Sequence, residues 1–78
     1  MKWANGEGEH YVAQADYDFT AGNPQELSFK AGQTLRLAPR TMQPRVKGWV
    51  LAAIDSQHSG LVPSNYIKIV SKQGDGVK

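Results

Sequence analysis

Apolar and polar residues alternate over short segments of this chain, and no segment shows the three-to-four-residue apolar spacing of a long helix. Alternation with a period of two is typical of half-buried strands, whose successive side chains point to opposite faces. Glycine, proline, asparagine and serine separate the segments and favour turns. We therefore expect an all-β domain of about five short strands, drawn from residues 11–15, 27–29, 34–37, 49–54, 60–62 and 67–70.

The expected core consists of apolar residues that share one face of these segments: Ala13, Ala15, Leu27, Phe29, Leu35, Leu37, Ala52, Val62 and Ile67. In the longest apolar run, residues 49–54, alternation directs Val50, Ala52 and Ile54 to this core. Trp49 then lies on the opposite face. We expect that face to be unburied, so that the tryptophan stays partly exposed.

The chain has 78 residues, enough for one small domain, and its formal net charge is only +2. It has no cysteine, so neither disulfides nor thiolate metal sites stabilise it. No apolar run is long enough to span a bilayer, and no signal peptide is visible. We expect a flexible leader at residues 1–9, a domain at residues 10–71 and a flexible tail at residues 72–78. Within the leader, Trp3 either packs loosely or not at all, or folds back on the domain.

Four motifs follow one another in the chain: ADYDF at residues 15–19, ELSFKAG at 26–32, GW at 48–49 and GLVPSNYI at 60–67. In this order and at this spacing they resemble the SH3 family, over roughly residues 11–70. The resemblance implies an SH3-like barrel of five antiparallel strands, with a short 3-10 turn before the last strand. It also implies a module that binds peptides, catalyses nothing and needs no cofactor.

SH3 domains read ligands in the polyproline II conformation, which has three residues per turn and no internal hydrogen bonds. Flat aromatic walls suit its proline rings, and free donors suit its carbonyl groups. The resemblance implies a peptide-binding role for Tyr17, Phe19, Glu26, Trp49, Pro63, Asn65 and Tyr66. The rings and Pro63 would form two slots, while the Trp49 indole, the Asn65 amide and the Tyr66 hydroxyl would donate hydrogen bonds. Glu26 would pair with a basic ligand residue beside Trp49.

Several positions depart from the common SH3 pattern. Phe19 lacks a hydroxyl group. The loop at residues 20–26, which corresponds to the RT loop of the family, offers Glu26 as its one candidate acid for the ligand. The long n-Src loop carries three cations, Arg40, Arg45 and Lys47. Clustered acids hold arginine-anchored ligands in this family, so we expect such binding to be weak and ligands with acidic or apolar flanks to be favoured. Alternatively, the three cations only keep a long loop soluble.

A subgroup resemblance rests on WANGE at residues 3–7, QPRVKG at residues 43–48 and WVLAAID at residues 49–55. These segments resemble the C-terminal SH3 domains of the peroxin thirteen family, peroxisomal membrane docking proteins of animals. The resemblance implies a parent protein in the peroxisomal membrane and a role in matrix-protein import. Implied partners are PxxP segments of peroxin fourteen, W-x-x-x-F/Y motifs of the import receptor peroxin five, and an F-x-x-x-F segment of the parent. The alternative is an SH3 adaptor domain of an unrelated signalling or scaffold protein.

Two other function classes find little support in the sequence. An enzyme is disfavoured because His10 and His58 flank the domain, in a leader and a hairpin loop where solvated histidines are usual, and no catalytic triad or metal site is plausible. A nucleic-acid-binding barrel would need cations among its exposed aromatics. Here Asp16, Asp18 and Glu26 accompany Tyr17 and Phe19 instead, and acids repel phosphate.

Overall fold

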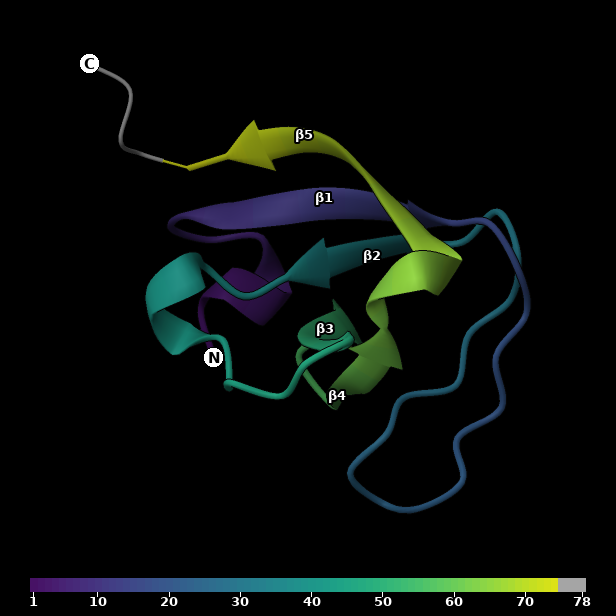
Figure 1. Ribbon diagram of the computed structural model, residues 1–78. Coiled ribbons are helices and arrows are strands. Elements are labelled where there is room, and N and C mark those ends of the chain that lie inside the picture. The colour runs from purple at the N-terminus through teal and green to yellow at the C-terminus, as the bar shows by residue number, and fades with distance from the viewer. Residues whose placement is uncertain (75–78) are drawn as a thin grey trace.

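The structure, a computed structural model, describes residues 1–74. It contains five strands, β1 (His10–Ala15), β2 (Thr34–Leu37), β3 (Trp49–Asp55), β4 (His58–Pro63) and β5 (Ile67–Gln73). Three 3-10 turns accompany them, η1 (Trp3–Asn5), η2 (Arg40–Met42) and η3 (Ser64–Tyr66). All five strands belong to one antiparallel sheet in the order β4-β3-β2-β1-β5, and Figure 1 shows them stacked in this order. The expected five-stranded SH3-like architecture, with a 3-10 turn before the last strand, is confirmed.

The register of the sheet places the predicted core residues on one face. Ala13 lies opposite Leu35 across β1 and β2, and Leu37 lies opposite Ala52 across β2 and β3. The first eight residues of the predicted core are buried in a single cluster, and the ninth, Ile67, packs against it half-buried. Because side chains alternate along each strand, the neighbours of these residues point to the outer face of the sheet.

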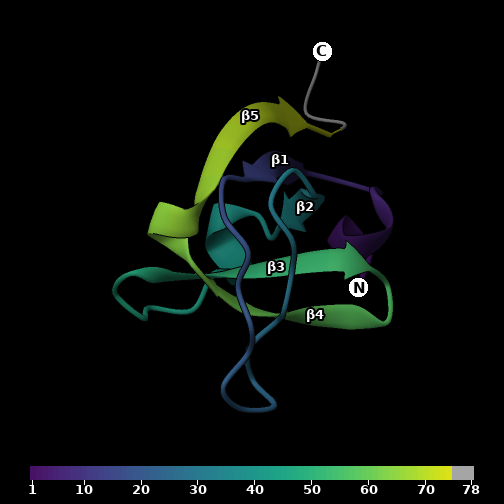
Figure 2. The same ribbon diagram turned by 90° about the vertical axis from the view of Figure 1, so that its right-hand side faces the viewer.

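The long connection between β1 and β2, residues 16–33, is the RT loop, and Figure 2 shows it extending beyond the strands. We expected a strand at residues 27–29, and this prediction is wrong. In this part of the loop there are only isolated bridges: Phe29 pairs with Phe19, and Glu26, the residue before the segment, pairs with Leu61. The backbone N–H of Leu27 donates to the carbonyl of Leu61 at 3.0 Å, so the loop is anchored to β4 without forming a regular ladder.

The N-terminal leader is packed rather than frayed, and of the two alternatives for Trp3 the structure has the one in which this residue folds back on the domain. The Trp3 side chain is only 4% exposed, and it forms a second apolar cluster with Ala4, Ala38 and Ala53. This cluster covers the outer face of β3, where Leu51 also packs, so the expectation that only one face of β3 is buried is wrong as well. A short 3-10 turn at η1 directs the tryptophan onto the sheet.

The boundaries of the sheet also differ from those expected. His10 is not a solvated leader residue: it begins β1, is 4% exposed, and its Nδ1 lies 3.0 Å from the carbonyl oxygen of Gly8. Strand β5 continues to Gln73 and pairs Lys72 with Tyr11, so the first part of the expected tail belongs to the sheet. Gly74 follows the strand, and residues 75–78 of that predicted tail lie outside the described residues.

Candidate functional site

Four aromatic rings from distant parts of the sequence form one continuous row. The ring centroids of Tyr17 and Tyr66 lie 5.5 Å apart, those of Tyr66 and Phe19 5.8 Å, and those of Phe19 and Trp49 5.9 Å. Each of these pairs meets edge to face, an arrangement that the ring quadrupoles favour. We call this row the aromatic groove. It contains every aromatic residue that the sequence predicted for the site.

The groove residues differ in exposure. Tyr17 is 59% exposed, while Phe19, Trp49 and Tyr66 are half-buried. Phe19 also contacts Phe29 of the core, with their centroids 5.6 Å apart. Pro63, the fifth predicted wall residue, is buried and lies opposite Trp49 in the β3–β4 ladder. Pro63 therefore lies next to Trp49 in the sheet and offers little surface of its own to a ligand.

Backbone hydrogen bonds fix the two ends of the groove relative to each other. The N–H of Asp16 donates to the carbonyl of Tyr66 at 2.8 Å, which joins the start of the RT loop to η3. The N–H of Ser64 donates to the carbonyl of Gly48 at 2.9 Å, which joins η3 to the residue before Trp49. Gly48 has φ +84°, a left-handed conformation that favours glycine.

The three predicted donors of the groove are available. Within residues 1–74, the Trp49 indole N–H, the Asn65 amide and the Tyr66 hydroxyl make no side-chain hydrogen bond. Asn65 is exposed, and the other two side chains are half-buried. Polar groups in this state can exchange water for a ligand carbonyl without breaking a bond within the protein.

Glu26 lies beside Trp49, as predicted, but its carboxylate is already engaged. Oε1 accepts a hydrogen bond from the backbone N–H of Gly22 at 2.7 Å, and Oε2 accepts one from Nδ2 of Asn23 at 3.1 Å. These bonds hold the tip of the RT loop. Glu26 also lines a pocket of about 250 Å³ between this tip and the n-Src loop, together with Asn23, Gln25, Val46, Trp49 and Leu61.

The n-Src loop, residues 38–48, is held by a residue that the sequence did not single out. The side-chain amide of Gln43 donates to the carbonyl oxygens of Ala38 and Leu51 at 3.0 and 3.1 Å. Its Oε1 accepts a hydrogen bond from the N–H of Leu51 at 2.7 Å. A glutamine in a polar loop carries no sequence signal of this role. The sequence analysis also missed Val46, which lines the 250 Å³ pocket. A single apolar residue between Arg45 and Lys47 is a sequence signal that could have indicated this role.

The three cations of the n-Src loop, Arg40, Arg45 and Lys47, are all exposed, and none forms an ion pair with another described residue. His58 is exposed in the β3–β4 hairpin, where its Nδ1 lies 2.8 Å from Oδ1 of Asp55. This hydrogen bond, with one from the backbone of Gln57, lowers the pKa of Asp55. The described residues contain no cluster of three or more potential metal ligands.

Comparisons with known proteins agree on one family. Residues 15–68 match the family model of the variant SH3 domain. The chain is 59% identical over 73 residues to peroxisomal membrane protein PEX13 of Caenorhabditis elegans, covering 92% of this chain and 22% of that protein. It is 54% identical over 71 residues to PEX13 of Rattus norvegicus, covering 91% of this chain and 18% of that protein.

Among solved structures, the C-terminal SH3 domain of myosin IB from Entamoeba histolytica, crystallised with a bound peptide, superposes with a TM-score of 0.65. It is 30% identical, and the match covers 78% of this chain and 93% of that one. The chain spans about a fifth of the length of its PEX13 relatives. Within the described residues, no helix has the length and apolarity needed to cross a bilayer.

Proposed function

We propose, from the premise that this chain belongs to the SH3 domain family and resembles the SH3 domain of PEX13, that it is a peptide-binding module of a peroxisomal import docking protein. The proposed ligands are short PxxP segments, bound across the aromatic groove. The proposed parent protein resides in the peroxisomal membrane. The family is one of binding modules rather than enzymes, and the groove offers rings and donors instead of a nucleophile with its base.

The observation that carries the proposal is the continuous row of partly exposed rings with unengaged donors. Tyr17 and Tyr66 form one end of the row, and Phe19 and Trp49 continue it. Because neighbouring rings are in contact, with centroids 5.5 to 5.9 Å apart, they form one continuous apolar surface on which proline rings can stack. A polyproline II ligand offers prolines to these faces and carbonyl oxygens to the donors, while its missing N–H groups leave nothing unpaired.

The pocket beside Trp49 supports ligands without an arginine anchor. Its single acid, Glu26, already accepts two hydrogen bonds from its own loop, so an incoming guanidinium would compete with them. The rest of the wall includes apolar Val46 and Leu61, and exposed Arg45 and Lys47 flank Val46 in sequence. An apolar or acidic ligand residue next to the PxxP core fits these walls better than a basic one.

The proposed partners follow from the resemblance to PEX13. They are a PxxP segment of peroxin fourteen, aromatic W-x-x-x-F/Y motifs of the import receptor peroxin five, and an F-x-x-x-F segment within the parent protein. Aromatics spaced i and i+4 share one face of a helix, so motifs of this form need an apolar patch rather than a proline ladder. The high identity to PEX13 favours this set over the alternative of a signalling or scaffold adaptor.

Two-dimensional NMR titration with a PxxP peptide and, separately, with a W-x-x-x-F peptide tests the proposal. We expect the PxxP peptide to shift the amides around Tyr17, Trp49 and Tyr66, with an affinity on the order of micromolar. The Trp49→Ala variant should lose at least about tenfold in affinity for that peptide while staying folded, because it removes a groove wall and a donor. A folded variant with full affinity would refute the groove assignment.

The preference at the n-Src loop has its own test. The double change Arg45→Glu and Lys47→Glu should weaken a PxxP peptide with acidic flanks and strengthen one with basic flanks. Lys68→Glu on β5, an exposed lysine outside the n-Src loop, is a control for reversal of a single charge elsewhere on the surface. Unchanged affinities in the double variant would mean that the loop cations serve only solubility.

A further inference from the structure

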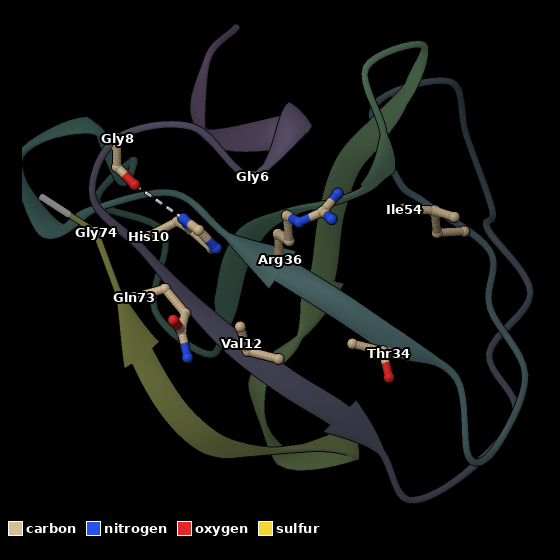
Figure 3. A pocket seen from close by; sticks show the side chains of 9 residues that line it. All are labelled: Gly6, Gly8, His10, Val12, Thr34, Arg36, Ile54, Gln73 and Gly74. Atoms are coloured by element: carbon tan, nitrogen blue, oxygen red, sulfur yellow. Dashed lines mark hydrogen bonds between the residues drawn. The ribbon is translucent and has the colours of Figure 1, made fainter.

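A pocket of about 750 Å³ lies apart from the aromatic groove, over the outer face of the sheet. Val12 of β1 and Arg36 of β2, which are cross-strand partners, form its floor. The leader closes one end with Gly6 and Gly8, and Gln73 of β5 borders it (Figure 3). None of its lining residues belongs to the groove, so a ligand here would not compete with a groove ligand for contacts.

Arg36 is held in place by the leader, yet most of its hydrogen-bonding capacity is unused. One guanidinium nitrogen donates to the carbonyl oxygen of Ala4 at 3.0 Å. A Cβ on Gly6 would approach the guanidinium to 3.2 Å, so the glycine lets the planar group lie against the backbone. A guanidinium has five N–H donors, and no carboxylate among residues 1–74 pairs with this one.

The pocket contains no acidic side chain among its described lining residues. A half-buried guanidinium in such surroundings has a fixed position and no counter-charge, which is the condition in which a carboxylate binds in bidentate geometry. Lys72, the other cation near this end of the sheet, is already paired with Glu9 at 3.2 Å. The pocket therefore offers one unpaired positive charge, which suits a ligand group with one negative charge.

The other polar groups on the wall accept as well as donate. Nδ1 of buried His10 must donate to Gly8, because a carbonyl oxygen only accepts, so Nε2 is the free acceptor of the neutral ring. Figure 3 shows this ring between Gly8 and Arg36. Gln73 uses its amide nitrogen on Ser71, which leaves its oxygen free. These acceptors suit a ligand that brings N–H donors together with its negative charge.

We propose that this pocket binds the carboxylate side chain of an acidic peptide segment, with Arg36 as its anchor. The peptide N–H groups next to the acidic residue would meet the acceptors of His10 and Gln73, and its aliphatic stem would meet Val12 and Ile54. A phosphate offers acceptors but few donors, and an anionic membrane requires a cluster of exposed cations rather than one recessed guanidinium. A peptide carboxylate satisfies both the charge and the hydrogen-bonding pattern of the wall.

NMR titration of the 78-residue chain with a capped alanine-rich hexapeptide containing one glutamate, and with its glutamine twin, tests this proposal. We expect saturable shifts at the amides of Val12, Thr34, Arg36 and Gln73, with the glutamate peptide about tenfold tighter than its twin. Arg36→Gln should reduce the affinity about tenfold, to that of the twin. The control Lys68→Gln removes one positive charge from an exposed position on β5 outside both sites and should leave the affinity unchanged.

Several outcomes would overturn the proposal: equal binding of both peptides, no binding of either, or an Arg36→Gln variant with unchanged affinity. Inorganic phosphate that shifts the same amides at lower concentration than the peptide, or binding only to vesicles of anionic lipid, would also overturn it. Should Arg36→Gln fail to fold, Val12→Glu places a carboxylate opposite Arg36 and should block the peptide. Binding of a PxxP peptide is measured in parallel, and its retention in these variants separates this site from the groove.

Discussion

Replacing Trp3 with alanine tests whether the leader is part of the folded domain. The indole is 4% exposed and packs on Ala38 and Ala53, which are themselves almost fully buried. A tryptophan buries about 150–250 Å². At about 25 cal/mol per Å² this burial is worth about 4–6 kcal/mol before the loss of side-chain rotamer freedom is subtracted. Alanine retains little of it.

The cluster lies on the outer face of the sheet, so water can enter once the indole is removed and no closed cavity remains. We therefore expect a loss near the lower end of the range for tryptophan replacements, about 3 kcal/mol. A domain of this size has a total stability of about 4–12 kcal/mol, so this loss is a large share of it. The corresponding fall in the midpoint of thermal unfolding is about 12–24 °C.

Circular dichroism melts and urea unfolding of Trp3→Ala measure this loss directly. The matched control is Trp49→Ala, which removes the same side chain from a half-buried position in the groove and should destabilise by only about 1 kcal/mol. If Trp3→Ala melts within about 4 °C of the unchanged chain, the leader contributes little free energy and the domain begins at β1. In Trp3→Ala, fluorescence of the remaining tryptophan, Trp49, reports groove integrity.

Three further predictions concern single contacts. Gln43→Ala should destabilise the domain by about 2 kcal/mol and speed hydrogen exchange at the Leu51 amide, which donates to Gln43; unchanged exchange would contradict this role. Gly60→Ala should destabilise by about 2 kcal/mol in urea unfolding, because its Cβ would lie 2.8 Å from the Gln25 carbonyl oxygen; Ser59→Ala is the neutral neighbour. The hydrogen bond from His58 lowers the pKa of Asp55, so its stabilising effect is present above the ordinary pKa and is lost as the pH falls through the lowered one. Asp55→Asn should therefore weaken the pH dependence of stability below about pH 4, and an identical acid profile would refute this.

The strands and the core could be predicted from the sequence because alternation is a local signal. Ala13, Leu35 and Ala52 are small or aliphatic, recur at the strand period and meet in one cluster. The aromatic groove was predictable through the family motifs, which fix the order and spacing of its rings. At residues 27–29 alternation predicted a strand that does not form. There the RT loop makes a backbone hydrogen bond to β4 without a regular ladder.

Other features depend on long-range contacts that leave no local pattern. Trp3 stands among polar and glycine residues, and only the folded sheet shows that it covers Ala53. Gln43 is an ordinary loop residue until its amide meets the backbone of Leu51. We expected the carboxylate of Glu26 to pair with a cation of the ligand. In the structure it accepts hydrogen bonds from Gly22 and Asn23 of its own loop. Trp3 and Gln43 thus contact groups outside their own segments, whereas Glu26 is bound by donors of its own loop.

The leader contacts one of the two proposed binding surfaces, the outer pocket, but not the aromatic groove. Alternation along β2 sends Leu35 and Leu37 to the core and Thr34 and Arg36 to the outer pocket. The carbonyl of Ala4 holds the Arg36 guanidinium, so loss of the leader would free the anchor of the outer pocket. The groove is fixed by bonds between the RT loop, η3 and Gly48, none of which involves the leader. A destabilised leader should therefore impair acidic-peptide binding first, and two ligands could occupy the folded domain together.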